Sequence, residues 1–511
     1  MKSIVRLSLV ALVSASLAAC GGIGTGSGGG GLEKARADFA SQSYPSARTT
    51  LFAMLEKEPD NLQVLALLGR TQIALGDADA ADRVLARLRK AGGKGAELRR
   101  LEAGVSLLRG KPAAALALIV NDFDTDAWRL RAQAQLALGK QTDALASFEK
   151  GMGAGDDLPL SVAYARLALE TGDLARAGQI LARMNRFAPG AYNTLVLAGD
   201  IAAARGETDG AIAAYGKATS AYPGKVPPML ALANALDEKG EVDAAMRVVE
   251  KAAKLSSGDP ALEEMRIQLL AEKGEWKTIR LALQGREGRI DPASSLGLTY
   301  GEALLRLGHA EQARVLFSRA SLLLPGNPFA RMMLGEAQLA SGDARGAWET
   351  LKPLASGTLA QPEILVSAER AARAAGAPEA DVLKARLDPV RLKATMALAD
   401  KGQAALSAQD WKLALATYRE LLQRGDDPEV LKRMALAAAG LGQGSDALAY
   451  ADRARTLVPD NPDYLHVAGL VRLELGRDLS GARRLLEAAA IADPRDPDIA
   501  RDLGKAKAAA S

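Results

Sequence analysis

Cysteine, histidine and aromatic residues are all scarce in this chain of 511 residues. It has one cysteine, Cys20, two histidines, His309 and His466, and 4% aromatic residues. A single cysteine has no partner for an internal disulfide, and two histidines cannot form a multi-histidine metal site. Few aromatics, and no long alternating β-branched runs, disfavour a β-sheet. Abundant alanine, leucine and arginine favour helices instead.

Sequence motifs of catalysis are also missing. The chain has no G-x-x-x-x-G-K-[ST] phosphate loop, no H-E-x-x-H and no G-x-S-x-G. Its 65 basic and 61 acidic residues leave a net charge of +4 that is spread along the chain. Such a mixed surface has no electrostatic footprint for nucleic acid. We therefore expect a protein that is not an enzyme, needs no cofactor or metal, and binds no nucleic acid.

The N-terminal segment, residues 1–19, has the pattern of an export signal. It begins with a basic stretch and continues with an apolar run from Leu7 to Ala19, which is too short to span a bilayer. The run ends Leu17-Ala18-Ala19-Cys20, which resembles a bacterial lipobox. That resemblance implies cleavage before Cys20 and lipidation of its sulfur, and Gly21 in place of aspartate resembles an outer-membrane sorting signal. The alternative is an ordinary secretory signal with an incidental cysteine. Residues 20–31, rich in glycine and serine, predict a flexible linker.

One turn residue recurs along the rest of the chain with a period of 33 or 34, apart from a single step of 29. Such a period is typical of stacked helical hairpins, in which a glycine ends the first helix in a left-handed conformation. In the first hairpin the turn is predicted at Ser43-Tyr44-Pro45 instead. The recurring residues are Gly76, Gly110, Gly139, Gly172, Gly206, Gly240, Gly274, Gly308, Gly342, Gly376, Gln409, Gly442 and Gly476.

The repeating unit resembles the tetratricopeptide repeat. The clearest unit has small residues at Gly301, Ala313 and Ala320, a bulky residue at Phe317, and Pro325 at its end. The resemblance implies an all-α fold, a right-handed superhelical solenoid of about 13–14 hairpins. We predict an N-terminal array over residues 32–383, a C-terminal array over 384–497 and a capping helix over 498–511. Two units depart from the pattern, because Ile279 and Asp381 replace a small residue, and looser or shifted helix contacts are expected there.

The resemblance also implies a concave groove lined by the first helix of each hairpin. Positions 2, 5, 9 and 12 of that helix tend to face the groove in this family. Position 9 is mostly polar in this chain, so its residues would form a ladder along the groove. The alternative is a solvated helix face without a partner. We name eight of them the candidate ladder: Arg70, Gln133, Arg166, Asp200, Asn234, Gln268, Glu302 and Glu336.

Together these features favour a non-enzymatic scaffold. We expect a lipoprotein that is anchored in the outer membrane, faces the periplasm and binds protein partners of an envelope assembly. The overall plan resembles lipoproteins of exopolysaccharide export and PEP-CTERM sorting systems, so a polysaccharide along the groove is a further expectation. Two alternatives stay open: an assembly chaperone for outer-membrane proteins or pili, and a regulator of an envelope hydrolase.

Overall fold

The computed structural model describes residues 29–423 and 425–509. The predicted signal peptide, Cys20 and most of the linker lie outside these residues. Within them every element is an α-helix except one short 3₁₀ helix, and no strand occurs. The predicted all-α fold is therefore confirmed. The chain divides into two compact units, Met1–Glu241 (unit 1) and Val242–Ser511 (unit 2).

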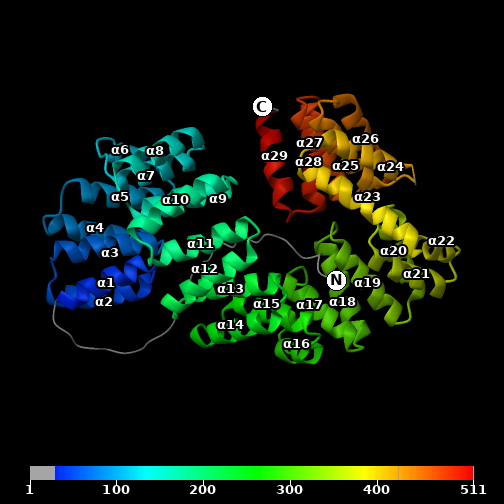
Figure 1. Ribbon diagram of the computed structural model, residues 1–511, viewed down its shortest axis with the longest axis horizontal. Helices are drawn as coiled ribbons and strands as arrows, with labels where there is room; N and C mark the ends of the chain where they lie inside the picture. The colour runs from blue at the N-terminus through cyan, green and yellow to red at the C-terminus, as the bar shows by residue number, and fades with distance from the viewer. Residues whose placement is uncertain (1–28, 424, 510–511) are drawn as a thin grey trace. The chain divides into compact units, whose positions relative to one another are not determined.

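Unit 1 runs from blue to green in Figure 1 and consists of six antiparallel helix pairs, each joined by a tight turn, followed by the single helix α13. Its helices are α1 (Gly29–Ala40), α2 (Tyr44–Lys57), α3 (Leu62–Ala74), α4 (Ala78–Lys90), α5 (Ala96–Leu108), α6 (Pro112–Leu118), α7 (Thr125–Ala137), α8 (Gln141–Ala154), α9 (Leu158–Glu170), α10 (Leu174–Phe187), α11 (Tyr192–Ala204), α12 (Thr208–Ala221) and α13 (Val226–Glu238).

Unit 2 continues from green to red with the same alternation of first and second helices. Its elements are α14 (Val242–Leu255), α15 (Pro260–Glu272), α16 (Trp276–Leu283), η1 (Glu287–Arg289), α17 (Ser295–Arg306), α18 (Ala310–Leu323), α19 (Pro328–Ala340), α20 (Ala344–Ser356), α21 (Pro362–Ala374), α22 (Glu379–Arg386), α23 (Pro389–Ser407), α24 (Trp411–Leu422), α25 (Pro428–Gly440), α26 (Gly444–Leu457), α27 (Pro462–Glu474), α28 (Leu479–Ala492) and α29 (Pro497–Ala509).

The recurring turn residue has the predicted conformation throughout. All thirteen positions have a positive φ, between 57° at Gln409 and 90° at Gly342. In the first hairpin the predicted turn was wrong by a short distance. Gln42, one repeat before Gly76, has φ 59°, and α2 already begins at Tyr44. Proline at the start of a helix fits its first turn, so Pro45 belongs to α2 and not to the turn.

Helix α1 begins at Gly29, before the predicted start of the array at Leu32. Glycine is a poor helix former, so composition indicated a linker up to residue 31. Gly31 lies close to the side chain of Met54 on α2. Packing against the neighbouring helix therefore extends α1 into residues that the sequence alone marks as flexible.

Small residues let the two helices of a hairpin approach closely. A Cβ atom added to Gly301 would lie 2.7 Å from the ring of Phe317, and one added to Gly335 would lie 2.5 Å from Leu351. Both distances are too short for real atoms, so only glycine fits at these contacts. Phe317 and Leu351 are in turn fully buried. The alternation of small and bulky residues along the repeat thus produces the core.

The second helix is short in three hairpins. Helix α6 has 7 residues, and α16 and α22 have 8 each, whereas the regular second helices have 12 to 14. The hairpins of α16 and α22 are those in which Ile279 and Asp381 replace a small residue. Helix α6 lies within the one short step of the period, between Gly110 and Gly139. A departure from the repeat therefore marks each short second helix, in residue type for α16 and α22 and in spacing for α6.

Ion pairs with the same sequence separation recur along the chain. Five pairs join residues 27 positions apart at distances of 2.5 to 2.8 Å: Asp82–Arg109, Glu149–Arg176, Asp156–Arg183, Lys352–Glu379 and Asp426–Arg453. Exposed pairs of this kind contribute little stability each, roughly 0–1 kcal/mol. Glu149–Arg176 and Lys352–Glu379 join second helices of neighbouring hairpins. Asp156–Arg183 and Asp426–Arg453 instead join the second helix of a hairpin to the loop that precedes that hairpin.

Hydrogen bonds connect the chain on both sides of residues 384–396, where a break between two arrays was predicted. The buried carboxylate of Asp427 accepts a 2.9 Å hydrogen bond from the backbone N–H of Leu359 and also caps α25. Arg386 donates to the backbone carbonyls of Ala355 and Gly357. The loop between α20 and α21 is therefore attached to both α22 and α25. The boundary at residues 383 and 384 stays a prediction.

Candidate binding face

The first helices of successive hairpins form the inner row of each unit. In unit 1 the row α3, α5, α7, α9 and α11 is in direct contact from one helix to the next, as is the row α15, α17, α19 and α21 in unit 2. Contact between consecutive second helices is slight at most in the described residues. A row of helix pairs that is in contact along one side and spread apart along the other is curved. The side in contact is then the concave side. We call the exposed surface of the first helices the concave face.

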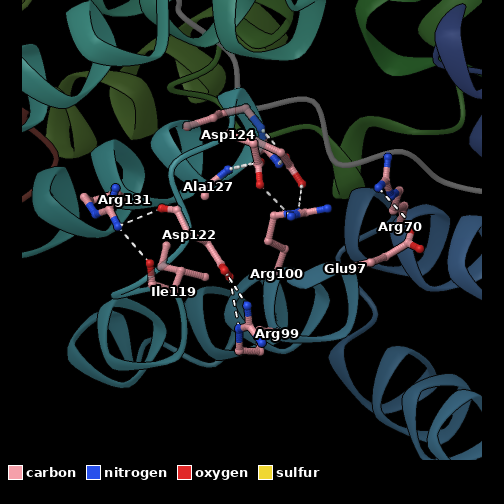
Figure 2. Close-up of polar contacts among 11 residues, drawn as sticks. Arg70, Glu97, Arg99, Arg100, Ile119, Asp122, Asp124, Ala127 and Arg131 are labelled. Carbon is pink, nitrogen blue, oxygen red and sulfur yellow. Dashed lines mark hydrogen bonds and ion pairs between the residues drawn. The ribbon is translucent and has the colours of Figure 1, made fainter. Parts of the chain in front are cut away.

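All eight residues of the candidate ladder lie on first helices, five of them in unit 1 and three in unit 2. In unit 1, Arg70 on α3 pairs with Glu97 on α5 at 3.1 Å (Figure 2). Gln133 on α7 accepts a 3.1 Å hydrogen bond from Arg129. Asn234 on α13 is exposed. Arg70 and Gln133 are therefore available at the surface of the inner row, and Asn234 is available on α13, the first helix that follows this row in the sequence.

A carboxylate surrounded by arginines lies at the centre of this surface. Asp126 on α7 forms ion pairs with Arg129 at 2.5 Å and with Arg100 on α5 at 3.5 Å. Burial opposes the ionisation of Asp126, but the positive charges of Arg129, Arg70 and Arg100 outweigh it and lower the pKa of this carboxyl. Asp126 therefore stays ionised and fixes α5 against α7.

The loop between α6 and α7 is held by three more arginine contacts, which are drawn in Figure 2. Arg99 donates to the buried carboxylate of Asp122 at 3.1 Å, and Arg100 pairs with Asp124 at 2.6 Å. Arg131 donates to the backbone carbonyl of Ile119 at 2.8 Å. These bonds compensate for the short α6, and they keep α7 in register so that Asp126 reaches Arg100.

Arg166 and Asp200 belong to one cluster with two tyrosines. Asp200 on α11 accepts a 2.8 Å hydrogen bond from the hydroxyl of Tyr215. Burial raises the pKa of Asp200, although the hydrogen bond and the charge of Arg166 act in the opposite direction. Burial and the charge of Asp200 raise the pKa of Tyr192 to about 12, against the effect of Arg166. Arg166 itself is exposed and forms no ion pair with any described residue.

In unit 2 the charges of the ladder are neutralised by neighbouring arginines. Glu302 on α17 pairs with Arg306 at 3.0 Å. Glu336 on α19 pairs with Arg370 on α21 at 3.1 Å, which joins position 9 of one hairpin to position 9 of the next. Gln268 on α15 is exposed. Both units therefore present ion pairs on their first helices, and unit 1 also presents the exposed Arg166, which has no ion pair with the described residues.

Three residues that complete the face of unit 1 were not predicted. Arg100, Asp126 and Arg129 were missed because the candidate ladder was drawn from position 9 alone. Asp126 stands at position 2 of its hairpin, and Arg100 and Arg129 stand at position 5. Both positions are among those that tend to face the groove in the family that the repeat resembles. Following positions 2 and 5 as well would have identified this cluster.

The face can make hydrogen bonds and ion pairs to a partner. In the described part of the chain, no group of three or more metal-ligating side chains is close enough to hold a metal ion. None of the described helices is long and apolar enough to cross a membrane. The surface thus has the character of a polar recognition site on rigid helices.

Comparisons with known families agree with this architecture. A tetratricopeptide-repeat family model matches residues 35–105 and 202–269, and a second model of the same repeat matches residues 399–462. The chain contains tetratricopeptide repeats. The matched residues lie in both units, and tetratricopeptide repeats generally bind protein partners. No curated protein matches the chain.

Two solved structures are similar to the chain over most of its length. The APC/C hetero-tetramer Cut9–Hcn1 is 14% identical with a TM-score of 0.35, and the match covers 92% of this chain and 95% of the other. Yeast Tom70 is 15% identical with a TM-score of 0.26, and the match covers 94% of this chain and 95% of Tom70. At these TM-scores the likeness says nothing of partners or activity.

Proposed function

We propose that the protein is a lipid-anchored scaffold of the bacterial envelope, whose concave face binds an extended segment of a protein partner. It would be attached to the outer membrane through Cys20 and face the periplasm. The observation that carries the binding role is the row of polar side chains on consecutive first helices, with the exposed Arg166 among them. Within the envelope we assign it to exopolysaccharide synthesis and export.

The chemistry of the face supports a protein segment as the partner. Gln133 and Asn234 carry amide groups, which pair with the N–H and C=O groups of an extended backbone. Arg166 adds a positive charge for an acidic side chain. Gln133, Arg166 and Asp200 stand on three consecutive first helices of unit 1, so an extended chain meets them in succession. A polysaccharide is the second partner to be tested, because the same amides also bind hydroxyl groups.

The binding face can be tested with a triple variant of the full chain. Gln133→Ala, Arg166→Ala and Asn234→Ala together remove three exposed or half-buried groups from first helices without opening the core. The matched control is Asp143→Ala, Gln179→Ala and Lys217→Ala, which changes three exposed residues on second helices of the same unit. After cross-linking in the native bacterium, we expect envelope proteins to co-purify with the control and not with the triple variant.

Equal recovery of partners with both variants would contradict a role for the concave face. For the polysaccharide alternative, purified protein is heated with and without isolated exopolysaccharide. A rise in melting temperature that the triple variant loses would favour glycan over protein as the occupant of the face.

The lipid anchor has a separate test. Stable attachment requires more than one acyl chain, and these chains depend on the sulfur of Cys20. Cys20→Ser is expected to move the protein from the membrane fraction to the soluble fraction after cell disruption. It should also abolish incorporation of an alkyne-labelled fatty acid. Unchanged membrane attachment of Cys20→Ser would overturn the anchor and leave the binding face untouched.

A further inference from the structure

The first hairpin touches α11, although the contact points lie far apart in the sequence. The side-chain amide of Gln42, at the turn between α1 and α2, donates a 2.6 Å hydrogen bond to the side-chain oxygen of Asn193 at the start of α11. Unit 1 therefore curves until its first hairpin meets the first helix of its sixth. Figure 1 shows α1 and α2 on the same side of unit 1 as α11.

Gln42 occupies a position where a side chain is unfavourable. Its φ of 59° is left-handed, and the corresponding turn of every later hairpin has glycine except at Gln409. A residue other than glycine in this conformation is strained and persists when its surroundings hold it. At Gln42 the side chain has a specific partner across the unit. Glycine at position 42 would relieve the backbone strain, but it would remove the hydrogen bond to Asn193.

Other polar groups gather around the same contact. Burial raises the pKa of Tyr44, which follows Gln42 closely, and the positive charges of Arg166 and Arg129 partly offset this effect. The ammonium group of Lys225 lies 5.3 Å from the centre of the Tyr192 ring and is attracted by Asp38 of α1. Charged and aromatic side chains from the first hairpin and from the far end of unit 1 therefore meet here.

The apolar cores on the two sides of this contact are separate. Ala35, Leu51 and Leu55 of the first hairpin pack with residues of α3, α4 and α5. The core that contains Leu197 and Ile201 of α11 is built from residues of α7 to α10. The first hairpin thus shares a core with α3, whereas the contact with α11 is made by polar groups. A contact of this kind opens without exposing either core.

We infer that the α1–α2 turn and the start of α11 form a clasp that closes the concave face of unit 1 and opens to admit a partner. The clasp consists of Gln42, Tyr44 and Asp38 on one side and Asn193, Arg166 and Lys225 on the other. It rests on the proposed function in one respect, that the concave face is the binding face. Closure brings Tyr44 near Arg166, so the clasp narrows the approach to the concave face at this arginine.

The experiment uses a reporter thiol on the concave face. Gln133→Cys is introduced in the Cys20→Ser chain, so that the protein has a single thiol, and its reaction rate with a bulky maleimide is measured. The clasp is then broken with Gln42→Gly, which removes the amide and at the same time suits the left-handed turn. The matched control is Gln409→Gly, the same change at an equivalent exposed turn of unit 2.

We expect Gln42→Gly to raise the rate at position 133 at least threefold, and Gln409→Gly to leave it unchanged. A second reporter, Lys217→Cys, measures reactivity at an exposed site on the second helix α12, outside the concave face, and should not respond to either change. Asn193→Ala breaks the same hydrogen bond from the other side and should reproduce the effect of Gln42→Gly. Circular dichroism during heating confirms that each variant is folded.

An equal rate at position 133 with and without Gln42→Gly overturns the clasp. The outcome is independent of partner binding, because no partner is present. If the clasp opens but the triple variant of the binding face still recovers its partners, the clasp stands and the proposed function fails. If the rate is unchanged while the triple variant loses its partners, the proposed function stands and the clasp fails.

Discussion

At the scale of single residues, Asp126 offers the most direct test of the polar cluster in unit 1. Asp126→Asn keeps the shape of the side chain but removes the charge that holds Arg129 and Arg100. Hydrogen bonds to charged groups contribute about 2 kcal/mol, so a loss of roughly that size in the free energy of unfolding is expected. Urea denaturation measures it. Asp143→Asn, an exposed acid on α8, is the control and should change stability by less than about 0.5 kcal/mol.

The contribution of Asp126 should depend on pH with a defined sign. Its pKa is lower in the folded protein than the ordinary value near 3.8. A depressed pKa stabilises the folded state above the ordinary value, and this stabilisation is lost as the pH falls through the folded value. The difference in the free energy of unfolding between the wild-type protein and Asp126→Asn should therefore be constant near neutral pH. It should shrink below about pH 4. A difference that grows on acidification would contradict this account.

A second test at this scale uses two glycines of one hairpin. A Cβ atom at Gly199 would overlap the ring of Tyr215, whose hydroxyl donates to Asp200. Gly199→Ala should therefore destabilise the protein by about 2 kcal/mol through overpacking. Gly216 on α12 has no atom within 4 Å of an added Cβ, so Gly216→Ala should be neutral or stabilising by up to about 1 kcal/mol. Similar effects of both changes on urea denaturation would contradict the packing of this hairpin.

At the scale of elements, α29 is held to the end of unit 2 by a buried carboxylate. Asp502, which is 1% exposed, bonds to His466 on α27 at 3.0 Å and to Lys505 at 2.9 Å. Burial opposes its ionisation, but hydrogen bonds from Arg501, Lys505 and His466 lower its pKa well below the ordinary value. Helix α29 thus covers the last hairpin, and the buried carboxylate of Asp502, paired with basic side chains and with His466, holds it there.

Asp502→Asn is expected to release α29 before the rest of unit 2 unfolds. Removing one partner of a buried charged network costs about 3 kcal/mol, and a terminal helix has a neighbour on one side only to compensate for the loss. Hydrogen exchange should become at least tenfold faster in residues 497–509 and stay unchanged in α25. Asp498→Asn, on the exposed side of the same helix, serves as control. Equal acceleration in both variants would show that Asp502 is not the anchor.

Element boundaries show which parts of this fold the sequence specifies. The turn positions from Gly76 to Gly476 were predicted correctly, because glycine marks twelve of these left-handed turns and the period marks Gln409. Gln42 is not a glycine and was missed, although it stands one repeat before Gly76, where the same period places a turn. The start of α1 at Gly29 was missed because Gly31 packs against Met54 of α2, a contact that the local sequence does not show. Tertiary contacts override local preference where the sequence has no local signal.

At the scale of the whole molecule, the two compact units should respond to mutation separately. Gly199 belongs to unit 1 and Asp502 to unit 2. In repeat proteins stability is nearly a sum of local and nearest-neighbour terms. Gly199→Ala should therefore accelerate hydrogen exchange around α11 and α12 and leave α27 to α29 unaffected, while Asp502→Asn has the reverse pattern. Uniform acceleration along the chain in either variant would indicate a single cooperative unit.

The candidate ladder was predictable only in part at this scale. Its residues lie on first helices because the repeat frame places position 9 there, and Glu336 even pairs with the equivalent Arg370. The period could not reveal that Tyr44 lies near Arg166. These two residues come together through the curvature of unit 1, which accumulates over several hairpins. Sequence periodicity describes neighbours, and it contains no information on how far the array turns.

The contact between Gln42 and Asn193 makes unit 1 sensitive to the number of its hairpins. Duplicating one whole hairpin would leave ion pairs such as Glu149–Arg176 intact, because each pair needs only the adjacent hairpin. A hairpin duplicated between Gln42 and Asn193 would displace their side-chain amides relative to each other, so that their hydrogen bond would be lost. Most of the array is thus expected to tolerate the insertion of whole repeats. The segment between Gln42 and Asn193, in contrast, needs a fixed number of repeats, because inserting or deleting one would break the contact between these two residues.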